Sequence, residues 1–185
     1  IVKSPHFYLV TDIPRLKLDG KSRYLGRHEL AHLYIQRAEM AYRDFVGAFG
    51  DRVSLPRPCG IYLLRDESVK EEIAARYFGL PGPELYYGGE ITRIGGGYPY
   101  NGCAISVKKH RDDRTLHARM RHLIGHLLVS CWVRVSGKDR YLPRWVFAGA
   151  AQWLSRRPEM FAEMASFCAG EGAVVSHSGK GWDKK

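Results

Sequence analysis

Leu116–Ser155, LHARMRHLIGHLLVSCWVRVSGKDRYLPRWVFAGAAQWLS, is the stretch of this chain that decides its fold. It contains His122 and His126, whose spacing of four residues places two imidazoles one turn apart on the same face of a helix. The residues from Leu123 to Val133 are apolar on almost every side, which indicates that this helix is buried. A second helix is predicted to begin in the segment P-R-W-V-F-A-G-A-A-Q-W that follows.

The chain before this stretch contains short apolar segments and one long amphipathic segment. His6–Val10 (HFYLV) and Ile61–Leu64 (IYLL) are apolar and bounded by turn signals, so both are predicted strands, the second fully buried. Gly102–Lys108 (GCAISVK) alternates well enough for a strand at or near a sheet edge. A helix is predicted from Gly26 to Phe49, and Arg15–Ser22 is expected to be a polar loop. The apolar stripe of that helix consists of Leu30, Tyr34, Ala38, Ala41, Phe45 and Ala48.

These segments indicate an α+β domain. The expected architecture is a small mixed sheet covered by a long backing helix, a buried His-x-x-x-His helix and the helix that follows it. An extended segment is also expected near Glu90–Ile94, and a short helix over Glu159–Ala169. Residues 1–169 are predicted to form a single domain, and the Gly/Ser/Lys-rich residues 170–185 a flexible tail.

The composition is that of a folded, basic protein. The chain of 185 residues has 29 Lys and Arg against 19 Asp and Glu, which gives a formal net charge of +10. The positive residues are scattered, without a dense tract interleaved with aromatics, so nucleic acid is not an expected partner. No apolar run reaches the roughly 18 residues that a membrane span needs, so no transmembrane segment is predicted.

The cysteines do not form a recognisable metal-binding pattern. None of the four shows the C-x-x-C spacing of a zinc ribbon. Cys59 and Cys103 flank predicted strands and could form a disulfide in an oxidising compartment. Cys131 and Cys168 lie on apolar helices and are interpreted as buried thiols. The compartment therefore stays unknown, with an extracytoplasmic location (periplasmic or secreted) favoured.

A complete H-E-x-x-H motif, His28-Glu29-Leu30-Ala31-His32, occurs near the start of the long predicted helix. In zinc peptidases this pattern supplies two metal ligands and a general base. A third ligand would have to come from Glu71 or Glu72 on another helix. The polar face that carries both histidines, opposite the apolar stripe, also carries Gln36, Glu39 and Arg43. The preferred interpretation is a solvated helix face, and a working site there is an open alternative.

Leu142–Trp153 (LPRWVFAGAAQW) is similar to the Leu-Pro-x-Trp-Leu-x-Glu-Gly-x-Ala-x-Tyr/Trp motif of the peptidase MA-like (gluzincin) zinc metallopeptidases. With the histidine helix upstream and the opening strand, long helix and IYLL strand, it makes most of residues 6–165 resemble such a domain, with its zincin-like fold. The motif is degenerate, because His122-Leu-Ile-Gly-His126 stands in place of H-E-x-x-H and Ala148 in place of the third-ligand glutamate.

The resemblance implies a role for each matching position. His122 and His126 would be vestigial positions of the first two zinc ligands, Leu123 falls at the general base, and Ala148 at the third ligand. Catalytic zinc normally has three protein ligands and a water, so two imidazoles alone would bind it weakly. The Gly102–Lys108 strand would be the edge strand along which a peptide lies. The possible groove residues are therefore Cys103, Ala104, Ile105, Ser106 and Gln152.

The loss of both glutamates favours a pseudo-peptidase, a catalytically inactive metallopeptidase-like domain that serves as a binding or structural subunit. A protein partner or larger assembly would contact its groove, its edge strand or its aromatic loops. The residues of those loops are Tyr77, Tyr86, Tyr87, Tyr98 and Tyr100. The balance is against enzymatic activity, and no cofactor is expected, or zinc if any metal binds. The alternatives are an active zinc metallopeptidase with Glu29 as base and His28 and His32 as ligands, and a non-hydrolytic metal site at His122 and His126.

Overall fold

The computed structural model describes residues 1–50, 55, 58–69, 72–73, 90–93, 102–106, 112–135 and 144–155. These residues contain a five-stranded sheet in the order β1-β2-β5-β7-β6. Its strands are β1 (Val2–Lys3), β2 (Phe7–Thr11), β5 (Cys59–Leu64), β6 (Glu90–Arg93) and β7 (Gly102–Ser106). β2, β5 and β7 are parallel, whereas β1 and β6 pair antiparallel at the two edges. The prediction of a mixed sheet is confirmed.

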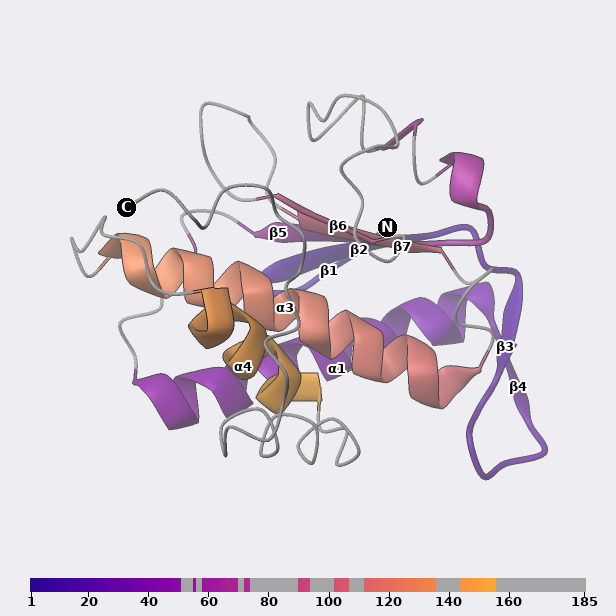
Figure 1. Ribbon diagram of the computed structural model, residues 1–185. Coiled ribbons are helices and arrows are strands. Elements are labelled where there is room, and N and C mark those ends of the chain that lie inside the picture. The colour runs from indigo at the N-terminus through magenta and orange to yellow at the C-terminus, as the bar shows by residue number, and fades with distance from the viewer. Residues whose placement is uncertain are drawn as a thin grey trace, which may run out of the picture.

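Three helices lie on one side of this sheet (Figure 1). They are α1 (Arg27–Phe49), α3 (Asp113–Val135) and α4 (Arg144–Ser155). α1 packs on β2, α3 contacts α1, β6 and β7, and α4 packs against α3 (Figure 1). The predicted α+β class, with a long backing helix and a buried helix followed by another, is therefore what the described residues form.

The core lies between the sheet and the helices α1 and α3. All six residues of β5 are buried, because this central strand is covered on both faces. Ile61 and Leu63 belong to the core on the helix side. On the other face, the hydroxyls of Tyr8 and Tyr62 lie 3.1 Å apart. A Cβ on Gly60 would come within 2.6 Å of the Tyr8 hydroxyl oxygen, so a larger residue would displace the rings of Tyr8 and Tyr62.

Helix α1 has the boundaries that the sequence predicts. Five residues of its apolar stripe, all except Ala48, are fully buried. Ala48 is exposed, so its assignment to the core was wrong: the last turn of the helix extends past the sheet. Gly50 ends the helix with φ +89° and donates its N–H to the Val46 carbonyl oxygen at 2.8 Å.

The prediction of a loop over Arg15–Ser22 is confirmed for residues 18–22 and was wrong for Arg15–Lys17. β3 (Arg15–Lys17) pairs antiparallel with β4 (Tyr24–Gly26) in a separate two-stranded sheet. Leu16 and Leu25 lie opposite each other and both are buried. A strand of three residues is too short to show a period, and these two become strands because their buried leucines pack on the core.

The prediction of a strand at or near a sheet edge over Gly102–Lys108 is confirmed, because β7 is the second strand from one edge, but the edge position that the resemblance implies was wrong. β7 lies inside the sheet between β5 and β6, and its described part ends at Ser106. The edge belongs to β6, which confirms the extended segment near Glu90–Ile94. The boundary at residue 169, the tail 170–185, the helix over Glu159–Ala169 and the tyrosine-rich loops lie outside the described residues. No helix in the described part of the chain is long and apolar enough to cross a membrane.

Candidate functional site

His122 and His126 lie on α3 where it packs against α4. Their Nε2 atoms are 3.1 Å apart, so one ring donates its N–H to the other. The two rings meet edge to face, with centroids 4.7 Å apart and planes inclined by 83°. Both side chains are half-buried, although the helix around them is buried. The predicted pairing of the two imidazoles is therefore present.

The close crossing of α3 and α4 depends on Gly125. A Cβ at this position would lie 2.6 Å from the Ala151 Cα atom, a distance that side chains essentially never adopt. The glycine thus brings the α4 backbone next to the histidine pair, where a hydrogen bond with the Ala151 backbone acts on His122. The sequence places Gly125 between the two histidines, but nothing in its pattern shows which helix it meets.

Burial and positive neighbours hold His122 neutral. Desolvation lowers the pKa of this imidazole most, and the charges of His126 and Arg119 lower it further, whereas the hydrogen bond with the Ala151 backbone raises it. The resulting pKa is about 3, against an ordinary 6.5. At neutral pH the side chain is therefore an uncharged hydrogen-bonding group.

This shift predicts a loss of stability in acid. In the unfolded chain His122 regains its ordinary pKa and binds a proton that the folded state excludes. The free energy of unfolding should then be unaffected above about pH 6.5 and fall as the pH drops towards 3. Urea unfolding of the wild type at about pH 7 and about pH 4.5 measures this loss.

The matched variants are His122→Gln and His32→Gln, one at the half-buried pair and one on the exposed face of α1. His122→Gln should make unfolding less sensitive to pH over this window, and His32→Gln should not. An equal pH dependence in His122→Gln and the wild type would contradict the assignment.

Leu123 and Ala148, the two positions that the sequence compares with glutamates, lie on α3 and α4. Leu123 is 4% exposed and part of the hydrophobic core, so its side chain offers no base. Ala148 lies on α4, one turn before Gln152. Gln152 is buried, and its Nε2 has no hydrogen-bond partner in the described structure. No group of three His, Cys, Asp or Glu able to hold a metal occurs among the described residues. The donor set therefore does not fit a catalytic zinc.

The second pair, His28 and His32, lies on the exposed face of α1. Their Nε2 atoms are 3.3 Å apart and both side chains are exposed, as the polar face predicted. Glu29 of the same motif points elsewhere. Its Oε2 accepts the Gly26 N–H at 3.1 Å and its Oε1 pairs with Arg23, so this carboxylate caps the start of α1.

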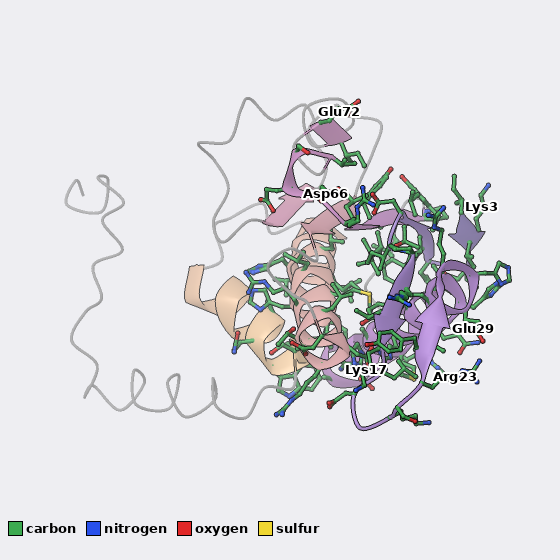
Figure 2. The ribbon with its side chains drawn as sticks, turned by 90° about the vertical axis from the view of Figure 1, so that its right-hand side faces the viewer. Lys3, Lys17, Arg23, Glu29, Asp66 and Glu72 are labelled. Atoms are coloured by element: carbon green, nitrogen blue, oxygen red, sulfur yellow. The ribbon has the colours of Figure 1, made fainter. Side chains whose placement is uncertain are left out.

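A third ligand for this second pair is not supplied by Glu72. Figure 2 shows Glu72 at the top of the molecule, far from Glu29 near Arg23 and the β3–β4 hairpin. Glu71 lies outside the described residues. In the structure, therefore, Glu29 is engaged as a helix cap, and Glu72 lies far from the motif that it would have to join (Figure 2).

For four of the five possible groove residues, the structure gives the strand and its register. Cys103, Ala104, Ile105 and Ser106 lie on β7, and Cys103 is opposite Ile61 rather than Cys59. Cys59 is therefore two residues along the neighbouring strand, a diagonal Cα separation of roughly 8 Å from strand geometry. Because disulfides need Cα atoms within about 7 Å, this register does not allow the Cys59–Cys103 pairing.

Comparison with known proteins does not identify this site. No protein-family model, curated protein or solved structure matches the chain. The chemistry of the site therefore rests on its own residues.

Sequence reasoning missed a buried polar network at the start of α3. Asp113 accepts hydrogen bonds from Arg37 at 2.5 and 3.1 Å and from the Tyr34 hydroxyl at 2.9 Å. The network borders a pocket of about 990 Å³ that none of the four paired histidines lines. The four aspartates and four arginines of this pocket are Asp19, Asp44, Asp112, Asp113, Arg37, Arg43, Arg114 and Arg121. The formal negative and positive charges among these residues are therefore equal in number.

Proposed function

We propose that this chain is a catalytically inactive metallopeptidase-like domain, a pseudo-peptidase of the gluzincin type, that acts as a binding or structural subunit. The observation that carries the proposal is the His122–His126 pair. Its Nε2 atoms hydrogen-bond to each other at 3.1 Å, and Leu123, at the position of the general base, is buried in the core. Losing a general base alone typically removes about 10²–10⁴-fold of a hydrolytic rate.

The arrangement of the helices supports the zincin-like part of this proposal. A helix that carries His-x-x-x-His crosses the following helix closely at Gly125 and Ala151, and that following helix carries Ala148 and Gln152. A mixed sheet with an antiparallel edge strand lies on one side of these helices. This is the order of elements that the sequence resemblance implies.

The alternative active site at the exposed motif finds less support. Glu29 is held by the Gly26 N–H and by Arg23, and a carboxylate that caps a helix is not directed at a water between His28 and His32. A base has to reach the proton that it removes. The motif therefore has a structural use at the start of α1.

A binding role is supported by the edge of the sheet. β6 pairs with β7 on one side and is the last strand that the described residues contribute to the sheet, so within this part of the chain its other side offers backbone donors and acceptors. An extended segment of a protein partner could add to this edge as a further strand. In this proposal β6 is the edge strand along which a peptide would lie, a role that the resemblance implied for Gly102–Lys108.

The test is zinc content and peptidase activity. The wild type, His126→Ala and His32→Ala are purified from zinc-supplemented culture, passed through gel filtration and assayed on an unfolded protein substrate. We expect no stoichiometric zinc and no cleavage in any of the three. One equivalent of zinc together with cleavage of the substrate, both lost only in His32→Ala, would establish the alternative active site. Zinc that disappears only in His126→Ala would establish a metal site at the half-buried pair.

The variant Ala148→Glu tests for a gain of zinc binding at the position of the third ligand. If α4 presents position 148 to the two imidazoles, the added carboxylate completes a three-ligand set and should tighten zinc binding by at least about 100-fold. Ala148→Gln has the same shape without the charge and should gain much less. Peptidase activity should stay absent in both, because Leu123 still supplies no base. Equal zinc affinity in the two variants would show that position 148 does not face the histidines.

A further inference from the structure

The exposed face of α1 presents two imidazoles at the spacing of a metal chelate. His28 and His32 lie one turn apart near the start of this helix, with ring centroids 4.5 Å apart. Their Nε2 atoms are 3.3 Å apart. Two imidazole nitrogens bound to one ion at about 2.0–2.1 Å each are about 2.9 Å apart in the square-planar arrangement that Cu²⁺ prefers and about 3.3 Å apart in a tetrahedral one, so small side-chain adjustments suit either ion. The two side chains therefore hold a spacing that one metal ion can bridge.

We propose that His28 and His32 form a surface chelate for a hydrated late-transition-metal ion, with Cu²⁺ bound more tightly than Zn²⁺. The proposal goes beyond the function given above, because it concerns another helix and requires no hydrolysis. Imidazole suits copper, nickel and zinc, and at a site with two nitrogen ligands and otherwise water the general order of affinities favours Cu²⁺ over Zn²⁺.

The setting of the pair explains why it binds metal without forming a peptidase site. Glu29 is engaged with Gly26 and Arg23, so it contributes neither a ligand nor a base. The described part of the chain brings no third metal-binding side chain to the two histidines. Water then fills the remaining coordination positions, and the ion stays exposed and exchangeable.

The half-buried pair on α3 makes a useful contrast. Its Nε2 atoms are 3.1 Å apart, but desolvation already opposes a single positive charge on His122. A divalent ion would have to leave much of its hydration shell to reach these nitrogens. At the exposed pair the ion keeps its remaining water ligands, so the surface site should fill first.

The test is a titration with Cu²⁺ buffered by glycine, followed by calorimetry and by electron paramagnetic resonance. The wild type should bind one tight equivalent with hyperfine coupling to two nitrogens. His28→Ala and His32→Ala should each weaken this binding by at least about 100-fold, because each removes one of two linked binding groups. Both side chains are exposed, so circular dichroism should show both variants folded. Repeating the titration with Zn²⁺ should give weaker binding.

Two matched controls separate this site from its neighbours. His126→Ala should leave the Cu²⁺ affinity within about threefold of the wild type, and so should Glu29→Gln, since glutamine also completes a capping box. Cu²⁺ binding that survives in His32→Ala, or that is lost in His126→Ala, would overturn the assignment. A wild-type affinity no tighter than that of the single-histidine variants would also overturn it. Either result leaves the pseudo-peptidase proposal standing, because that proposal is tested by zinc retention and cleavage.

Discussion

Asp113→Ala is expected to lower the free energy of unfolding by about 3 kcal/mol, because it leaves a charge without its partner in a buried site. Asp113 is 5% exposed and holds Arg37 with two hydrogen bonds and Tyr34 with one. Burial acts to raise the pKa of Asp113, but the hydrogen bonds and charge of Arg37 lower it below its usual value, so the carboxylate is ionised at neutral pH. The network joins α1 to the first turn of α3.

Asp112→Ala is the matched control for this prediction. Asp112 is exposed and caps α3 by accepting the Thr115 N–H at 2.7 Å, so its loss should cost only about 1 kcal/mol. Urea unfolding at neutral pH, followed by circular dichroism, measures both variants. If Asp113→Ala destabilises the protein no more than Asp112→Ala does, the buried network does not stabilise the α1–α3 contact as described.

Gly125→Ala should destabilise the protein by about 1–3 kcal/mol, because the added methyl group overpacks the crossing of two helices. Its Cβ would meet the Ala151 Cα atom at 2.6 Å, so α3 and α4 have to move apart. That movement should also change the environment of His122, whose pKa depends on burial and on the Ala151 backbone. The measurements are the free energy of unfolding and the chemical shift of the His122 ring protons against pH.

Gly47→Ala is the same substitution in a place with room for it. Gly47 lies in α1, is exposed, and has no heavy atom within 4 Å of a built Cβ. Alanine is a better helix former than glycine, so this variant should be more stable by roughly 0.5–1 kcal/mol. The opposite signs of the two Gly→Ala effects test whether close helix packing, rather than helix propensity, requires glycine at 125. A stabilised Gly125→Ala would contradict the crossing.

Periodic patterns were sufficient to predict the long elements. The boundaries of α1, the burial of β5 and the helix that carries His122 and His126 follow from apolar spacing and length, because each repeats one pattern over many residues. The β3–β4 hairpin escaped prediction because each strand has three residues. Short strands depend on what packs against them.

The two histidine pairs show where sequence spacing stops being informative. Both have the i, i+4 spacing, and both bring their Nε2 atoms within 3.3 Å. Their surroundings differ: one pair lies exposed on α1, and the other is half-buried beside α4. The apolar residues that flank each pair predicted this difference correctly. The use of Glu29 as a helix cap was not predicted, because its partner Arg23 lies outside the motif.

The sequence by itself determined the α+β class, the burial of its long elements and the absence of glutamate at positions 123 and 148. Only the tertiary structure decided that β6 rather than β7 forms the sheet edge and that Gly125 meets Ala151. It also decided that Asp113 pairs with Arg37, 76 residues earlier in the chain. The physical reason is that helix and strand patterns are local, whereas strand order, helix crossings and buried ion pairs join segments whose spacing in sequence carries no signal.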